Sequence, residues 1–421
     1  MKILVSAFAC SPYQGSEPGV GWAAICHLAI HHDPYVLLDV SNQHSWEKAE
    51  SEGIIPANVR VRFLRTNKPC WQNRLMNRLQ NWLWYYAYNR VLLQSAIDWH
   101  EEENFDLCHQ ITIGTWRVPS PLWQMPIPFV WGPIGGGSRI DRKFRSMLSS
   151  KAIVFEIIRD FNSWLTLRSG KFKRCVENTD FIITTDSDTE ALIKPYREDR
   201  PMSRMLLSFY TDDRIQRFRR IDIDRPPHGP LKLFAGGNME GRKGLSVAVK
   251  ALALVKERGI RFTYIIAGGG PDIPHIKGLV QKLGISGSVF FHEGYKDESY
   301  LNILKESDIY LLPSFRESMG MTLVEAILSG CYPIVANTSA QGEIVGKVGG
   351  HAVGIDSIDS LIRGLAEAII WCSENRNILP QISSEISANA ANYVSSANYG
   401  HNINQAYENA LVAHSQEPPA A

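Results

Sequence analysis

The sequence predicts an α/β protein built from two Rossmann-like, doubly wound domains. Short apolar runs alternate with helical stretches from Lys2 to about Leu207, and a second alternation of the same kind covers Leu231 to about Ser373. Alternating strands and helices predict parallel sheets with helices on both faces. A chain of 421 residues, 44% of them hydrophobic, is long enough to fill two such cores.

The predicted domain boundaries follow from a turn-rich connector between the two alternations. The connector contains Ile221–Pro230, which is rich in Pro, Asp and Gly and leads into a new strand. The last part of the chain reads as a helix over Ile386–Ala413, followed by a frayed tail. The expected parts are an N-terminal domain (1–207), a linker (208–230), a C-terminal domain (231–384) and the terminal helix with its tail (385–421).

Composition excludes several classes of protein. A net charge of +1 lacks the basic excess of a general nucleic-acid binder. Seven cysteines, an odd number with no CxxC pair, indicate reduced thiols rather than a disulfide framework. We see no signal peptide and no apolar run of about 18 residues that would span a bilayer, so we expect a cytoplasmic protein.

The first domain opens with a strand over Lys2–Ala7 that leads into a glycine-rich loop. Gly15 in this loop lacks the Cβ that blocks close approach of the backbone to a ligand, and Gly135 and Gly136 have the same property in a later loop. Glu17 follows this loop and is a candidate site residue, although a glutamate in the first turn of a helix fits the sequence equally well.

A histidine follows a short apolar run in the same domain. The run Phe105–His109 reads as a strand and puts His109 at its C-terminal end. From spacing alone, a single histidine after a strand is more often a structural residue than a functional one.

Two segments combine aromatic and basic residues. The segment Trp71–His100 is rich in Trp and Tyr, and core packing on the sheet is the interpretation that we favour for it. The segment Arg139–Arg174 carries ten Lys or Arg against three Asp or Glu, with large apolar residues between them. We favour contact with an anionic membrane surface for this second segment over simple solvation of its charges, because its basic excess is local in a nearly neutral chain.

A glycine-rich loop opens the second domain. The strand that begins at Leu231 runs into Gly237–Gly244, and a helix is expected over Leu245–Lys256. Arg242 and Lys243 then lie at the C-terminal edge of a parallel sheet, where ligands of such sheets gather. A guanidinium fork and a compact ammonium group can together hold a diphosphate. The GxxxxGK[ST] spacing is absent, so we do not predict ATP hydrolysis.

The stretch Glu317–Gly330 repeats this strand-to-helix pattern. An apolar run over Asp308–Pro313 reads as a buried strand, and Thr322–Ser329 reads as a helix that ends at Gly330. The helix N-terminus offers free N–H groups to a phosphate. Glu317 and Glu325 flank it and can accept hydrogen bonds from sugar and ribose hydroxyls, so the pattern describes a nucleotide-sugar site. A surface glutamate and a glutamate favoured by the helix dipole remain the simpler alternative.

No metal site is evident in the sequence. There is no HxH or HExxH pattern. Asp186-Ser-Asp188 and Asp222-Ile-Asp224 have the Asp-x-Asp form. Both lie outside Gly237–Gly244 and Glu317–Gly330, so we interpret them as turn and linker acids. We therefore expect no metal and no cofactor.

In its second half the chain resembles glycosyltransferase family 4, the retaining glycosyltransferases of GT-B fold. The resemblance rests on Gly237–Gly244, Glu317–Gly330 and Cys331–Ala336, with softer support from Ile265–Pro271 and Val289–Tyr295. In the first half the match is looser and includes Asp106–His109 and Trp131–Gly137. The resemblance implies two Rossmann-like domains, with the terminal helix (385–421) crossing back to pack on the first. It also implies a UDP- or GDP-sugar donor, and a glycan or lipid-linked acceptor in polysaccharide, lipopolysaccharide or other glycoconjugate synthesis.

The resemblance also implies roles for the candidate residues. The reaction centre would comprise Glu317, His109, Arg242 and Lys243, with His109 touching the donor sugar. The donor would contact Gly15, Gly237, Arg242, Lys243, Gly320, Met321, Thr322, Leu323 and Glu325. The acceptor side would involve Glu17, Gly135 and Gly136. Many family members act at the inner membrane face, which agrees with peripheral membrane contact.

The sequence departs from the family pattern at three places. Ser208–Asp213 replaces the usual turn between the domains, Ala340–Glu343 shortens an expected glycine pair, and the first loop reads Gly-Ser-Glu-Pro-Gly. A nucleotide-sugar 2-epimerase of the same fold and a non-catalytic binding or assembly subunit remain as alternatives. The epimerase would need acid and base groups that the sequence does not reveal, and a non-catalytic subunit would not need to retain all four of Arg242, Lys243, Glu317 and Glu325.

Overall fold

The structure is a computed structural model that describes residues 1–15, 17–66, 77–207, 209–219, 229–294, 298–317 and 320–416, without the side chains of 77–82. The chain forms two compact units. Unit 1 comprises Met1–Gly137, Phe161–Phe209 and Ser396–Ala421. Unit 2 comprises Ser138–Asp160 and Tyr210–Ser395.

Unit 1 contains a seven-stranded parallel sheet in the order β3-β2-β1-β4-β5-β6-β7. The strands are β1 (Lys2–Ser6), β2 (Asp33–Asp39), β3 (Arg60–Leu64), β4 (Leu107–Gln110), β5 (Phe129–Ile134), β6 (Phe181–Thr184) and β7 (Met202–Arg204). The helices are α1 (Glu17–Leu28), α2 (Gln43–Ser51), α3 (Asn77–Glu103), α4 (Ser150–Arg168), whose first part lies in unit 2, α5 (Gly170–Asn178), α6 (Ser187–Ile193) and α15 (Ser396–Ser415).

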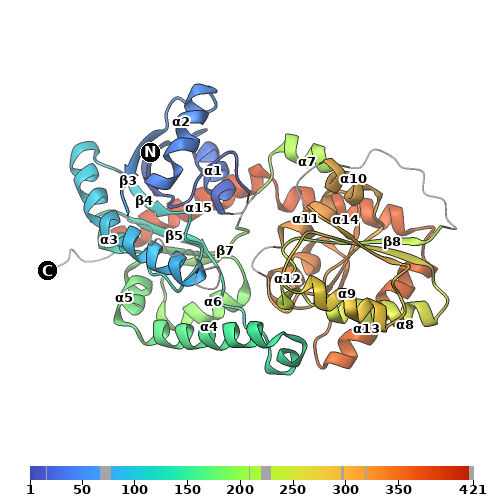
Figure 1. The fold of residues 1–421 in the computed structure, drawn as a ribbon. Helices are drawn as coiled ribbons and strands as arrows, with labels where there is room; N and C mark the ends of the chain where they lie inside the picture. The colour runs from blue at the N-terminus through green and yellow to red at the C-terminus, as the bar shows by residue number, and fades with distance from the viewer. Residues whose placement is uncertain are drawn as a thin grey trace. The chain divides into compact units, whose positions relative to one another are not determined.

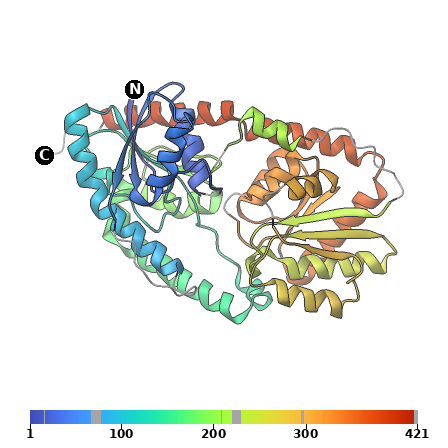
Figure 2. The same ribbon diagram turned by 45° about the horizontal axis from the view of Figure 1, so that its top comes forward.

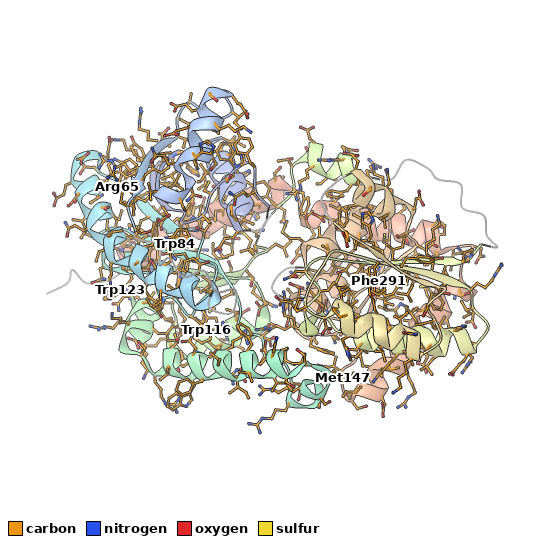
Figure 3. All side chains as sticks on the ribbon, in the orientation of Figure 1. Arg65, Trp84, Trp116, Trp123, Met147 and Phe291 are labelled. Carbon is orange, nitrogen blue, oxygen red and sulfur yellow. The ribbon has the colours of Figure 1, made fainter. Side chains whose placement is uncertain are left out.

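The core of unit 1 lies on both faces of this sheet because successive strand residues point to opposite sides. On β1, Leu4 packs with Tyr88 and Trp99 of α3, and Ile3 and Val5 pack on the opposite face. That second face is covered by residues of α1 and α15. The predicted core packing of the aromatic segment is therefore confirmed for Tyr88 and Trp99, and Figure 3 labels Trp84 on the same helix. Trp71 and the side chain of Trp82 lie outside the described residues.

Unit 2 contains a six-stranded parallel sheet in the order β10-β9-β8-β11-β12-β13. The strands are β8 (Leu231–Gly236), β9 (Phe262–Ala267), β10 (Val289–His292), β11 (Ile309–Leu311), β12 (Tyr332–Ala336) and β13 (His351–Val353). The helices are α7 (Asp212–Phe218), α8 (Leu245–Glu257), α9 (Ile273–Lys282), α10 (Glu298–Glu306), α11 (Met321–Leu328), α12 (Ser339–Val348), α13 (Ile358–Glu374) and α14 (Leu379–Tyr393).

Helices cover both faces of the unit 2 sheet. In Figure 1, α8, α9 and α13 lie on one side of the strands, and α11 and α14 lie on the other. Figure 2 shows the same layering from a second direction. The fold prediction of two doubly wound α/β domains is confirmed at the level of both sheets.

The predicted elements around the candidate site are close to those observed. The strand expected over Asp308–Pro313 is β11, the helix expected over Thr322–Ser329 is α11, and the helix expected over Leu245–Lys256 is α8. The single terminal helix expected over Ile386–Ala413 is instead two helices, α14 in unit 2 and α15 in unit 1. Ser208 and residues 220–228 of the predicted linker lie outside the described residues, as do Asp222, Asp224 and the tail from 417 to 421.

One segment before the predicted domain boundary at residue 207 belongs to the second unit rather than the first. Residues 138–160 pack in unit 2, although their sequence position suggests the first domain. The ring of Phe144 stacks on Phe315 with centroids 4.8 Å apart. A Cβ on Gly241 would lie 3.1 Å from Leu148, so the segment lies directly against the glycine-rich loop. Sequence periodicity could not reveal this exchange, because it depends on tertiary contacts.

Candidate functional site

The candidate site lies at the carboxyl ends of β8 and β11, which are neighbours in the unit 2 sheet. The chain runs outward from β8 to β9 and β10, and then returns to β11 on the other side of β8. The strand order therefore reverses between β8 and β11. Ligands of open α/β sheets bind outside the carboxyl ends of strands at such a switch point.

Backbone contacts join the loops that follow these two strands. Gly244 has φ +69°, and a Cβ there would lie 2.1 Å from the carbonyl oxygen of Pro313, so only glycine fits. The N–H of Phe315 donates to the carbonyl oxygen of Arg242 at 2.8 Å. These contacts hold the short 3-10 helix Gly241–Lys243 against the loop that carries Glu317.

Two cations of the first loop converge on one carboxylate of the second. The ammonium group of Lys243 donates to Oε2 of Glu317, and a terminal guanidinium nitrogen of Arg242 lies 3.5 Å from the same oxygen. Only 9% of the Lys243 side chain and 14% of the Glu317 side chain are exposed. The predicted association of Arg242, Lys243 and Glu317 is therefore present in the structure.

Arg242 has two further partners that fix its side chain. Its Nε donates to Oε2 of Glu240 at 2.9 Å, and its NH1 group donates to the carbonyl oxygen of Arg316 at 3.1 Å. Burial alone lowers the pKa of Arg242, but the carboxylates of Glu317 and Glu240 offset this effect and raise the pKa above its usual value. The guanidinium group therefore stays charged and oriented.

The amino-terminus of α11 is a further part of the candidate site. Gly320 precedes the helix with φ +67°, a conformation that glycine adopts readily. Met321, Thr322 and Leu323 form the first turn. The N–H of Leu323 donates to the carbonyl oxygen of Gly320 at 2.8 Å, whereas Met321 and Thr322 occupy the first positions of the helix, where backbone N–H groups point outward. A Cβ on Gly237, at the end of β8, would lie 3.8 Å from the Thr322 side chain. The β8 loop and the α11 terminus are thus adjacent.

Glu325 lies one turn further along α11, with 13% of its side chain exposed. The hydroxyl of Tyr300 on α10 donates to its Oε2 at 2.9 Å, and Arg214 on α7 lies 3.5 Å from its Oε1. Burial, and then the Glu325 charge, raise the pKa of Tyr300, so this hydroxyl remains a donor. Two partners from two other helices therefore orient the carboxylate.

The predicted role of His109 in the reaction centre is not supported by its position in unit 1. The ring has 0% exposure and lies in the middle of β4, paired with Val5 of β1. Its Nε2 lies 2.7 Å from the carbonyl oxygen of Gly132, and its Nδ1 lies 2.8 Å from the hydroxyl of Tyr407. Since a carbonyl only accepts, Nε2 carries the proton and Nδ1 accepts from Tyr407. Burial lowers the pKa of His109 to about 4, so the ring is a neutral structural residue.

Glu17 joins α1 to the loop after β4. Its Oε1 accepts from the N–H groups of Ile113 at 2.6 Å and Gly114 at 3.0 Å. Ile113 has φ +62°, which is unusual for a β-branched residue. The carboxylate therefore holds a strained loop in place, and its suggested acceptor role stays a prediction.

The candidate glycines of unit 1 lie in the loops after β1 and β5. Gly15 is exposed. A Cβ on Gly135 would lie 2.3 Å from the hydroxyl of Thr185, and one on Gly136 would lie 3.0 Å from Arg117, with φ +90°. The close packing of the latter two explains the need for glycine without a ligand, so their contact with a substrate stays a prediction.

Several residues of the site escaped the sequence analysis. Glu240, Tyr300, Arg214 and Arg316 all contact the predicted residues. Glu240 lies within the glycine-rich loop and could have been noticed as a carboxylate next to two cations. The other three belong to elements whose packing the sequence pattern does not determine.

Among the residues that the structure describes, no group of three or more His, Cys, Asp or Glu side chains is arranged to hold a metal ion. Asp186 is the N-cap of α6 and accepts from the N–H of Thr189 at 2.8 Å, which confirms its interpretation as a turn acid. The same described part of the chain contains no helix with the length and apolar character needed to cross a bilayer.

Comparison with known proteins agrees with the geometry of unit 2. Residues 217–387 match the family described as glycosyl transferases group 1. The chain is 30% identical over 153 residues to phosphatidyl-myo-inositol mannosyltransferase of Mycobacterium tuberculosis, covering 36% of this chain and 39% of that protein. The chain thus spans about a third to two fifths of the length of the first curated relatives that it matches.

Solved structures extend the similarity to nearly the whole fold. Sucrose-phosphate synthase from Thermosynechococcus elongatus has a TM-score of 0.65 at 15% identity, covering 98% of this chain and 99% of that chain. Anabaena Alr3699/HepE in complex with UDP also has a TM-score of 0.65, at 16% identity, covering 97% of this chain and 100% of that chain. Both likenesses concern the fold, which is that of GT-B glycosyltransferases.

Proposed function

Because residues 217–387 belong to the glycosyl transferases group 1 family, we propose that the chain is a retaining glycosyltransferase that uses a nucleotide-diphosphate-sugar donor. One observation carries this proposal. Arg242, Lys243 and Glu317 converge at the switch point between β8 and β11, and Glu325 follows on the helix that begins there. Cations and carboxylates side by side match a ligand that combines a diphosphate with hydroxyl-rich sugars.

The diphosphate is assigned to the cationic side of the site. Arg242 offers a planar fork, Lys243 offers a compact ammonium group, and the first turn of α11 adds the backbone N–H groups of Met321 and Thr322. Gly237 leaves room for the phosphates to approach the backbone, because it carries no side chain. These donors are fixed before a ligand arrives, so they lose little freedom when they bind it.

The two carboxylates are assigned to the hydroxyl groups of the donor. Glu317 would accept hydrogen bonds from the transferred sugar and favour the positive charge that develops on its ring. Glu325 would hold the ribose, since it lies further along α11 and is oriented by Tyr300. Neither carboxylate is placed on the diphosphate, because like charges repel.

The proposed reaction is a front-face transfer. The bond between the anomeric carbon and the diphosphate oxygen breaks with its electron pair leaving on the oxygen, and the acceptor hydroxyl oxygen bonds to the same face of the carbon. Because the new bond forms on the face that the diphosphate leaves, the configuration at the carbon is retained. The acceptor proton passes to the departing diphosphate. Arg242 and Lys243 stabilise the negative charge as it grows on the leaving group, which lowers the barrier.

We propose that this reaction needs neither a metal nor a cofactor, since two fixed cations and a helix terminus supply positive charge at the diphosphate. The proposed acceptor is a glycan or a lipid-linked sugar in polysaccharide, lipopolysaccharide or other glycoconjugate synthesis. A lipid acceptor is supported by the name of the mycobacterial relative. The proposed location is cytoplasmic, with peripheral contact to an anionic membrane.

A panel of UDP- and GDP-sugars tests the proposal. We expect one donor to raise the melting temperature and to undergo slow hydrolysis that chelators do not stop. Conversion of the donor to its 2-epimer would identify an epimerase instead. The absence of any thermal shift and any turnover across the panel would identify a non-catalytic subunit. Loss of hydrolysis on chelation would contradict only the metal-independent step.

A further inference from the structure

Helix α4 is inverted with respect to an ordinary surface helix. A helix of a globular protein normally buries its apolar face and exposes its polar face. Away from the ends of α4, its exposed large side chains are all apolar or aromatic. These side chains are 46% to 59% exposed and belong to Val154, Ile157, Ile158, Phe161, Trp164 and Leu165. The buried positions of the same helix are polar: Glu156, Arg159, Ser163 and Thr166.

The exposed residues form one stripe. Their spacing of three or four residues places them on a single face of the helix. Figure 3 shows side chains projecting outward along α4. Phe161 and Trp164 stack with centroids 5.9 Å apart and an angle of 15° between their planes, and the guanidinium of Arg168 lies 4.1 Å from the Trp164 ring. The stripe is therefore an ordered apolar surface with a cation at its end.

The polar face of the helix is held in place by specific contacts. Oε1 of Glu156 accepts from Arg316 at 2.7 Å, with 4% and 13% of the two side chains exposed. Arg159 donates to the carbonyl oxygen of Ser138 at 2.8 Å, and Ser163 accepts from Nε of Arg117 at 2.9 Å. Because Glu156, Arg159 and Ser163 have partners on this face, the helix cannot turn over to bury its apolar stripe without breaking these contacts.

Charge around the stripe is almost entirely positive. The exposed basic residues of the surrounding segment are Arg139, Arg142, Lys143, Lys151, Arg168, Lys171, Lys173 and Arg174. Asp141 is the one exposed acid there among the residues that the structure describes, and it pairs with Lys143 at 3.2 Å. Glu156 is buried and Asp160 is half-buried, and they pair with Arg316 and Arg145.

We propose that α4 docks on the surface of an anionic lipid bilayer, with its apolar stripe in the acyl boundary and its flanking cations at the head groups. An apolar face bordered by Lys and Arg is the pattern of helices that lie in the membrane interface. The charges favour lipid over a second copy of the chain, since pairing two such stripes brings like charges together. This inference rests on the geometry of α4 and does not depend on the proposed transfer reaction.

The docking helix also lies close to the two loops of the candidate site, which follow β8 and β11. Arg316, which pairs with Glu156 on the inner face of α4, directly precedes Glu317. In the same unit, Leu148 and Phe144 lie against Gly241 and Phe315. The helix proposed to bind lipid and the segment just before it are thus joined by side-chain contacts to both loops of the candidate site.

Sedimentation of the full chain with vesicles tests the docking surface. We expect the wild type to sediment with vesicles of phosphatidylglycerol and phosphatidylcholine, and less with phosphatidylcholine alone. Phe161→Asp removes an aromatic side chain from the stripe and should weaken binding at least about tenfold. Phe290→Asp, at a phenylalanine 50% exposed in unit 2, adds the same charge away from α4 and should bind as the wild type does.

Vesicle binding by a charge-reversed variant and light scattering of the lipid-free protein give two further tests. Lys171→Glu with Lys173→Glu should weaken binding to the anionic vesicles by roughly fivefold for each residue. The inference is overturned if the wild type does not bind anionic vesicles, or if Phe161→Asp binds as well as Phe290→Asp with an unchanged melting temperature. A lipid-free dimer in light scattering that Phe161→Asp converts to a monomer would overturn it in favour of a second copy as the occupant.

Discussion

The ammonium group of Lys243 on the β8 loop donates a hydrogen bond to Oε2 of Glu317 on the loop before α11, across 74 residues of sequence. Both side chains are nearly buried. A buried ion pair contributes little net stability, because desolvation of the charges opposes their attraction. The pair fixes the two side chains next to each other, and in the proposed function it would hold a cation for the diphosphate beside a carboxylate for the sugar.

Replacement of Lys243 tests the cationic half of this pair. We expect Lys243→Ala to lower kcat about 10²–10³-fold, because one fixed donor to the departing diphosphate is lost. Lys232→Ala is the matched control, since Lys232 lies on the same strand β8 in an exposed pair with Glu306. Initial rates of donor hydrolysis provide the measurement. Equal rates for the two variants would contradict the assignment.

Replacement of Glu317 tests the carboxylate half. Glu317→Gln keeps the size of the side chain and a hydrogen-bond acceptor for Lys243, but removes the charge that favours an oxocarbenium-like state. We expect kcat to fall at least about a hundredfold while the affinity for the free nucleotide diphosphate changes little. Rapid-quench rates and calorimetric titration separate the two effects. A variant that loses nucleotide affinity but keeps its turnover would contradict this role.

Tyr300 is expected to act through Glu325 as a positioning residue. Tyr300→Phe removes the hydroxyl that donates to Oε2 of Glu325 at 2.9 Å. Loss of a hydrogen bond to a charged group costs about 1.5–3 kcal/mol, so the KM for the donor should rise roughly tenfold or more, with kcat less affected. Tyr332→Phe serves as the control. It removes a hydroxyl that contacts His351, and these two residues lie at the amino ends of β12 and β13. A fall in kcat alone would show that Tyr300 acts differently.

Glu156→Gln tests the pair that anchors α4. It removes the carboxylate that accepts from the guanidinium of Arg316 at 2.7 Å, where 13% of the arginine side chain is exposed, so we expect a loss of about 3 kcal/mol in the free energy of unfolding. Glu102→Gln breaks the exposed pair with Arg62 and should change stability by less than about 1 kcal/mol. Urea denaturation measures both. Equal small losses would mean that the buried pair does not anchor the helix.

The buried His109 makes stability depend on pH. Its pKa is lowered from 6.5 to about 4 in the folded protein, so the unfolded chain binds more protons between these values. Its contribution is therefore fully present above about pH 6.5 and is lost as the pH falls toward 4, with a maximum of about 3 kcal/mol. Carbon-13 NMR of labelled histidine should show that the His109 resonance does not titrate above about pH 5. Titration near pH 6.5 in the folded protein would contradict the buried position.

The sequence predicted the parts of the site that depend on local pattern. Gly237, Arg242, Lys243, Glu317 and Glu325 stand at the ends of strands or the starts of helices, and parallel strands bring such positions to one edge of the sheet. The charged contact between Lys243 and Glu317 follows from this rule together with the adjacency of β8 and β11.

Other features depend on contacts between segments far apart in the chain. His109 is buried by Tyr407, which lies 298 residues away on a helix that returns to unit 1. Tyr300 reaches Glu325 only because α10 packs beside α11. Periodicity describes which face of an element is apolar, but it does not identify the partner of that face. The inverted helix α4 shows the limit clearly, since the large apolar residues of its stripe are exposed.

The central claim is that Arg242 and Lys243 hold a nucleotide's diphosphate at the switch point of unit 2. Phosphorus-31 NMR of UDP and GDP mixed with the protein tests it most directly. We predict that both phosphate resonances of one nucleotide shift and broaden with the wild type and with Lys232→Ala, and that Lys243→Ala abolishes or strongly reduces the effect. Unchanged resonances of both nucleotides with the wild type, or an undiminished shift with Lys243→Ala, would contradict the account.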